Sequence, residues 1–71
     1  MTTQKSNLLE FVSNELNDLN IKRAKLKCFL NSEKTKGIDP VQFSLLKIQL
    51  SAMKTYGKCL LERIIWMQKH G

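Results

Sequence analysis

Apolar residues recur at every third or fourth position over two long stretches of the chain. This spacing is typical of an amphipathic α-helix with one apolar stripe. We therefore predict one helix over about residues 4–35 and a second over about residues 40–68. The predicted seam positions are Leu9, Val12, Leu16, Leu19, Arg23, Leu26 and Leu30 in the first helix, and Phe43, Leu46, Leu50, Met53, Gly57, Leu60, Ile64 and Met67 in the second.

A short turn over residues 36–39 separates the two predicted helices. Gly37 is expected to end the first helix in the left-handed conformation. Four signals mark the start of the second helix. Asp39 is the predicted N-cap, Pro40 occupies the first helical position, and Gln42 is the capping-box partner. Ile38 and Phe43 occupy the two positions of a hydrophobic staple. Such a short connection favours an antiparallel two-helix hairpin, coiled-coil-like and all-α, formed by residues 1–71 as a single domain.

A second apolar stripe runs along the second helix. At ~100° per residue, its residues lie roughly 130° around the helix from the seam. A hairpin of two helices buries one stripe per helix, so the second stripe would stay exposed in a monomer. We therefore expect the hairpins to assemble into a homo-oligomeric helical bundle, with Phe11 and Phe29 widening the apolar surface of the first helix. The second stripe consists of Val41, Leu45, Ile48, Ala52, Cys59 and Trp66.

Polar residues interrupt the apolar surface at two places. Gln49, Tyr56 and Arg63 are spaced seven apart, so they form a line between the two stripes of the second helix. Arg23 occupies a seam position of the first helix, near the level of Met53 and Tyr56 in an antiparallel pairing. A guanidinium in a seam requires a partner, because burying an unpaired charge costs several kcal/mol.

Two explanations of these polar residues stay open. In the first, Gln49 and Tyr56 bond to one another across an oligomer interface. The two arginines then either extend their charged ends to the solvent or pair with Glu10, Glu15 or Asp18. In the second, the four residues bind a nucleotide-like ligand. Arginine matches phosphate oxygens, a tyrosine ring stacks on a base and a glutamine amide reads a base edge. The candidate ligand-binding residues are Arg23, Gln49, Tyr56 and Arg63.

The charge balance favours anionic partners. Twelve Lys and Arg against six Asp and Glu give a net charge of +6. Lys47, Lys54 and Lys58 are predicted on the far side of the second helix, as a solvated face. The basic run over residues 22–27 could follow a nucleic-acid backbone, but the dispersed basic residues and the lack of a helix-turn-helix pattern argue against nucleic acid as the partner.

The remaining chemistry is sparse. No carboxylate pair, nucleophile with a positioned His, phosphate loop or metal-ligand cluster stands out, so we expect neither an enzyme nor a cofactor or metal. Cys28 and Cys59 are expected to be buried apolar fillers. No run approaches the ~18 apolar residues of a membrane span, and the first residues lack a signal-peptide pattern, so a cytoplasmic location without membrane contact is expected.

Two segments of the chain resemble the short helical-hairpin proteins of tailed phages, described as relatives of a crAss-like phage protein. The segments are KLKCFLNSEK, residues 25–34, and LLKIQLSAMKTYGKCLLERI, residues 45–64. The likeness covers about two-thirds of the chain and is carried mostly by seam residues and their neighbours. The matching positions are Lys25, Leu26, Phe29, Leu30, Ser32, Glu33, Lys34, Lys47, Gln49, Leu50, Met53, Tyr56, Glu62, Arg63 and Ile64.

The resemblance implies a phage accessory protein acting in the bacterial host cytoplasm. Several phage proteins of similar design are oligomeric sponges that sequester the cyclic nucleotide signals of CBASS or Thoeris defence systems. By that analogy, the partner would be a cyclic nucleotide or a cyclic ADP-ribose-type signal, bound without cleavage. Two alternatives stay open: a helical adaptor or inhibitor that binds a protein through the second stripe, and a small nucleic-acid-binding accessory protein.

Overall fold

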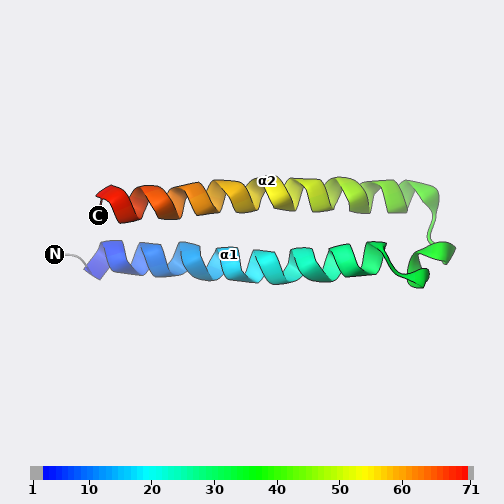
Figure 1. Cartoon of the computed structure of the whole chain (residues 1–71), viewed down its shortest axis with the longest axis horizontal. Coiled ribbons are helices and arrows are strands. Elements are labelled where there is room, and N and C mark those ends of the chain that lie inside the picture. Colours follow the sequence, from blue (N-terminus) through cyan, green and yellow to red (C-terminus); the bar gives the residue numbers. More distant parts are fainter. Residues whose placement is uncertain (1–2, 71) are drawn as a thin grey trace.

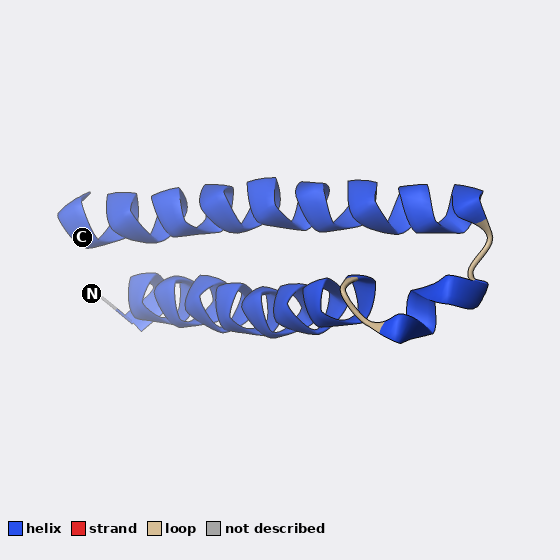
Figure 2. Ribbon diagram, turned by 45° about the vertical axis from the view of Figure 1, so that its right-hand side comes forward, coloured by secondary structure: helices blue, strands red, loops and turns tan. Residues whose placement is uncertain are grey.

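Two long antiparallel helices make up most of the computed structural model, which describes residues 3–70. Helix α1 spans Thr3–Leu30 and helix α2 spans Pro40–His70, joined through the short 3-10 helix η1 at Glu33–Gly37. The helices run side by side, with the start of α1 and the end of α2 at the same end (Figures 1 and 2). The hairpin measures 54 × 14 × 14 Å. The described residues contain no strand, so the predicted all-helical hairpin is confirmed.

The predicted seam forms the core between the helices. Val12 and Leu60 are fully buried and Leu19 is 8% exposed, while Leu16, Met53, Ile64 and Met67 pack partly buried against them. This core is small, because each helix presents only one narrow stripe to the other. The exposure of the apolar positions outside this stripe is a direct consequence of the two-helix architecture.

Helix α1 ends about five residues before the predicted boundary. The backbone N–H of Asn31 still bonds to the carbonyls of Lys27 and Cys28, but Ser32 turns its side chain back and donates to the Phe29 carbonyl at 2.7 Å. The same hydroxyl accepts a bond from the Lys34 N–H and thereby caps η1. A serine that bonds to local backbone competes with helix continuation, which explains the early end.

Asp39 begins helix α2 as predicted. Its Oδ1 accepts a hydrogen bond of 2.8 Å from the Val41 N–H, and Pro40 is the first helical residue. Two other predictions at this turn are wrong. Gly37 does not adopt a positive φ, because it ends η1, where the Ile38 N–H bonds to the Thr35 carbonyl. Gln42 is exposed and forms no capping-box bond, so Asp39 caps the helix alone.

The second apolar stripe is exposed along α2, as expected for a single hairpin. Val41, Ile48 and Trp66 are 66%, 63% and 61% exposed. Cys28 and Cys59 are also exposed, so their predicted burial is wrong, because both lie away from the one seam that a hairpin buries. Within the described residues, neither helix is apolar enough over a sufficient length to cross a membrane.

Candidate functional site

Arg23 lies in the seam opposite a glycine. A Cβ built on Gly57 would lie 3.5 Å from the Arg23 Nη1, which is an ordinary van der Waals contact. A side chain of Leu19 lies at the same distance from that position. Gly57 is buried between the helices, with Leu19 and the Arg23 guanidinium on its two nearest sides.

The hydrogen bonding of Arg23 is incomplete. Its Nη1 donates to the Asn20 side-chain oxygen at 3.2 Å, and its Nε is buried without a hydrogen-bond partner. Arg23 forms none of the pairings with Glu10, Glu15 or Asp18 that one of the two explanations allowed; its bond is to Asn20, one turn away in the same helix. A guanidinium with a buried, unbonded nitrogen and no carboxylate partner is a ready partner for an anion.

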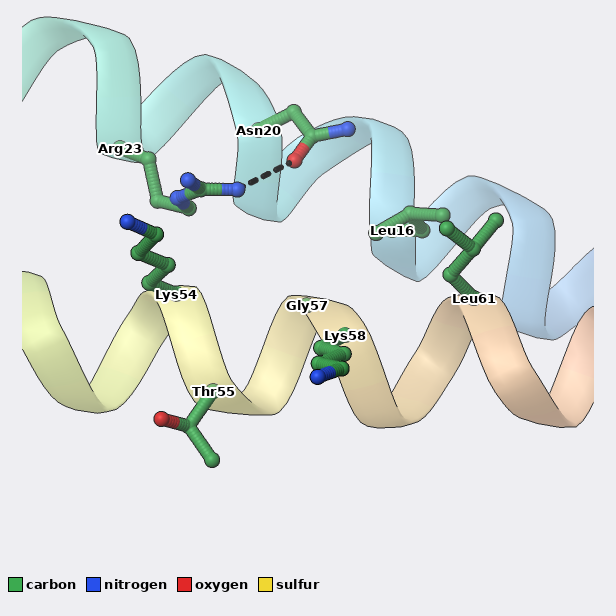
Figure 3. A pocket seen from close by; sticks show the side chains of 8 residues that line it. All are labelled: Leu16, Asn20, Arg23, Lys54, Thr55, Gly57, Lys58 and Leu61. Atoms are coloured by element: carbon green, nitrogen blue, oxygen red, sulfur yellow. Dashed lines mark hydrogen bonds between the residues drawn. The ribbon is translucent and has the colours of Figure 1, made fainter.

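Lys54 faces Arg23 from the other helix. Figure 3 shows the two side chains pointing toward one another, with Asn20 bonded to Arg23 and with Leu16 and Leu61 closing one end. These residues line a hollow of about 640 Å³ together with Gly57 and Lys58. Two cations directed at one another without a carboxylate between them attract a negatively charged group.

The hollow at Arg23 is part of a longer groove. A second hollow shares Asn20, Arg23 and Lys54 with the first, and a third shares Lys27, Leu50 and Lys54 with the second. We call the three together the basic groove; its cationic side chains are Arg23, Lys27, Lys47, Lys54 and Lys58. Lys47, Lys54 and Lys58 are exposed, as expected of a solvated face. Lys54 nevertheless points toward Arg23, whereas the Lys58 side chain runs away from α1 (Figure 3).

Tyr56 lies on the opposite side of the seam from the basic groove. Tyr56 and Lys58 flank Gly57, and at ~100° per residue two such neighbours project to opposite sides of a seam residue. The Tyr56 hydroxyl donates to a Glu15 carboxylate oxygen, and the residue is 44% exposed. Gln49 and Arg63 are exposed and share its side of the helix by their seven-residue spacing.

The four predicted ligand residues thus do not line one hollow within a single chain. Arg23 lines the basic groove, whereas Gln49, Tyr56 and Arg63 border none of its three hollows. Lys54, which lines all three, was assigned to a solvated face by the sequence analysis. The signal that identifies it is its position three residues before Gly57, because a lysine one turn from a seam glycine faces the same gap as Arg23.

The groove offers hydrogen-bond donors and no acid or base pair. Its polar lining consists of ammonium, guanidinium, amide and hydroxyl groups, and none of the residues that border it is a carboxylate. Among the described residues, no group of His, Cys, Asp or Glu could hold a metal ion. Such a lining can bind phosphate oxygens through charge-assisted hydrogen bonds.

Comparison with known families identifies the chain. Neither the curated proteins nor the solved structures contain a match. A family model described as Sequestin matches residues 6–65, which include every basic residue of the groove and the seam of both helices from Leu9 to Ile64. The family name indicates a sequestering role. Because this match covers most of the 71 residues, the chain belongs to the Sequestin family.

Proposed function

We propose that the chain is a phage anti-defence sponge, which binds and sequesters a cyclic nucleotide or ADP-ribose-derived immune signal without cleaving it. The observation that carries this proposal is the Arg23 guanidinium, which lies in the seam with no carboxylate partner and faces Lys54 across the groove. A phosphate between these two side chains would receive bonds from both helices. Membership in a sequestering family and the net charge of +6 support the same reading.

Each proposed site residue has a distinct role. Arg23 holds a phosphate from the groove. Arg63 lies on the other side of the seam in the same chain, so it would reach the same ligand from a second copy in the homo-oligomer. Tyr56 stacks on a base, for which its ring is sufficiently exposed at 44%, and Gln49 reads a base edge or orients Tyr56. The bond between the Tyr56 hydroxyl and Glu15 fixes the position of the ring.

We also propose that the functional form is a homo-oligomer. Ten large apolar or aromatic side chains among the described residues are exposed, against three that form the buried core. A second copy of this chain presents the same apolar stripe of α2, so the two surfaces match chemically and can close around a symmetry axis. In such an assembly, Gln49, Tyr56 and Arg63 border the interface, since they run beside the stripe.

The exposed stripe also favours a second candidate function. A helical adaptor or inhibitor would place Ile48 and Trp66 into an apolar groove of a partner protein, with no small ligand involved. The two functions differ in what stabilises the purified chain. A small ligand would raise the melting temperature of the protein alone, whereas an adaptor would respond only to its protein partner.

The experiment is a thermal-shift screen of the purified protein. The panel contains cyclic dinucleotides, cyclic trinucleotides and cyclic ADP-ribose isomers, with linear mononucleotides as controls. A ligand present at a hundred times its dissociation constant adds ~2.7 kcal/mol to the unfolding free energy, which is readily seen as a shift in melting temperature. If no ligand of the panel shifts the melting temperature, the sponge function is contradicted and the adaptor function is favoured. Salt-dependent retention of DNA or RNA would instead favour the nucleic-acid alternative.

A further inference from the structure

We infer that the basic groove binds an anion with two or more phosphate groups, and that one chain supplies all the groove side chains that hold these phosphates. The inference deepens the proposed function and rests on it for the identity of the natural ligand. Its physical basis is the placement of Arg23, Lys54 and their basic neighbours along one side of the seam.

The centre of the groove is Lys54. It lines all three hollows, and its side chain points toward Arg23 from the facing helix. The bond to Asn20 fixes the direction of the Arg23 guanidinium. An anion placed between them would therefore meet a guanidinium that is already oriented and a lysine that moves only at its flexible end.

The length of the groove sets the size of the ligand. Along the axis of α2, a rise of ~1.5 Å per residue places Lys47 about 10 Å from Lys54. The Lys58 side chain runs away from α1 (Figure 3), so Lys47 and not Lys58 extends the row of cations. Lys27 of α1 borders the part of the groove on the Lys47 side. A single phosphate contacts only the central pair, so the outer lysines are used only by a ligand that carries further phosphates.

The ends of the groove are less polar than its centre. Leu16 and Leu61 meet at one end, and Phe43 borders the other, with the Lys47 ammonium 5.5 Å from its ring centroid. Free polyphosphate would use only the cations, whereas a ligand that also carries a base or a ribose could contact these apolar ends. The phosphate-binding property can therefore be tested without the base.

The test is a calorimetric titration with tripolyphosphate and, separately, with orthophosphate at ~0.15 M salt, where the Debye length is ~8 Å. We expect one tripolyphosphate per chain, bound at least tenfold more tightly than orthophosphate. Lys54→Met should weaken tripolyphosphate binding roughly tenfold through loss of a charge-assisted contact. Lys25→Met removes the same charge from an exposed position outside the groove and should weaken binding less than about twofold, because that charge is screened.

Several results would overturn the inference. Equal losses in Lys54→Met and Lys25→Met would show that the anion responds only to net charge. A stoichiometry of one anion per two chains would show that a second copy completes the site. Amide chemical shifts that move at Glu15 rather than at Asn20 and Gly57 on titration would place the anion on the other side of the seam.

The outcome for the groove is separable from the outcome for the sponge. If a cyclic nucleotide binds the parent protein and Lys54→Met equally well, the groove inference fails while the proposed function stands. If tripolyphosphate binds through Lys54 but no cyclic nucleotide or ADP-ribose derivative binds, the proposed function fails while the groove inference stands. The oligomer mass of Lys54→Met should equal that of the parent; a change in mass would show that Lys54 makes a subunit contact and would also overturn the inference.

Discussion

Replacing Arg23 with Met should make the protein more stable. The buried Nε of Arg23 has no hydrogen-bond partner, and its only bond is to exposed Asn20. An unsatisfied buried polar group costs about 1–3 kcal/mol, and we take the low end because Arg23 is only half-buried. Methionine keeps the length of the aliphatic stem, matches arginine in helix propensity and completes the apolar seam.

The net change follows from these contributions. Loss of the exposed bond to Asn20 removes a few tenths of a kcal/mol from the stability gained by eliminating the unsatisfied Nε. The unfolding free energy should therefore rise by about 1 kcal/mol. For a domain of this size, that corresponds to an increase of about 4–8 °C in melting temperature. The measurement is thermal or urea unfolding followed by circular dichroism, at several protein concentrations so that a contribution from assembly is recognised.

Arg63→Met is the matched control for stability, because Arg63 is the other arginine of the chain and is exposed. Its unfolding free energy should stay within about 0.5 kcal/mol of the parent. A drop in stability of 1 kcal/mol or more in Arg23→Met, with Arg63→Met unchanged, would refute the reasoning. It would mean that Arg23 already has a strong partner, such as a carboxylate of a second copy.

Three further predictions test the turn and the exposed stripe. Asp39→Ala should lower the unfolding free energy by about 1 kcal/mol through loss of the Asp39–Val41 cap, and an unchanged urea midpoint would show that the cap is dispensable. Gly37→Ala should raise the unfolding free energy by about 0.4–1 kcal/mol, because no atom lies within 4 Å of the new Cβ and the φ of Gly37 is not positive. A loss of stability would contradict the η1 conformation. Ile48→Asp and Trp66→Asp should reduce the oligomer mass measured by light scattering, whereas a native mass in both would exclude the α2 stripe from the interface.

The hairpin could be predicted because its determinants are local and periodic. The three-four spacing fixed the seam, whose members Val12, Leu19 and Leu60 are the buried core, and Asp39 with Pro40 fixed the start of α2. The end of α1 was less predictable. Ser32 forms competing backbone bonds whose strength depends on the geometry of the turn, and periodicity does not report that geometry.

The candidate site could be predicted only in part. Arg23 was recognisable because a cation interrupted an apolar seam. Lys54 was not recognisable, because the sequence does not distinguish a lysine on a solvated face from a lysine at the edge of a groove. That distinction depends on the position of the facing helix. The hydrogen-bond partner of Tyr56 could not be predicted either, because its bond to Glu15 joins positions far apart in the sequence.

The measurement that tests the central claim most directly combines binding with recovery of the ligand. The protein is incubated with the cyclic nucleotide or cyclic ADP-ribose isomer that shifts its melting temperature most, separated from free ligand by gel filtration, and then denatured. Sequestration predicts that the ligand elutes with the protein and is released intact, as judged by chromatography and mass. A ligand that is released as a cleaved product, or that never co-elutes with the protein, would contradict the account.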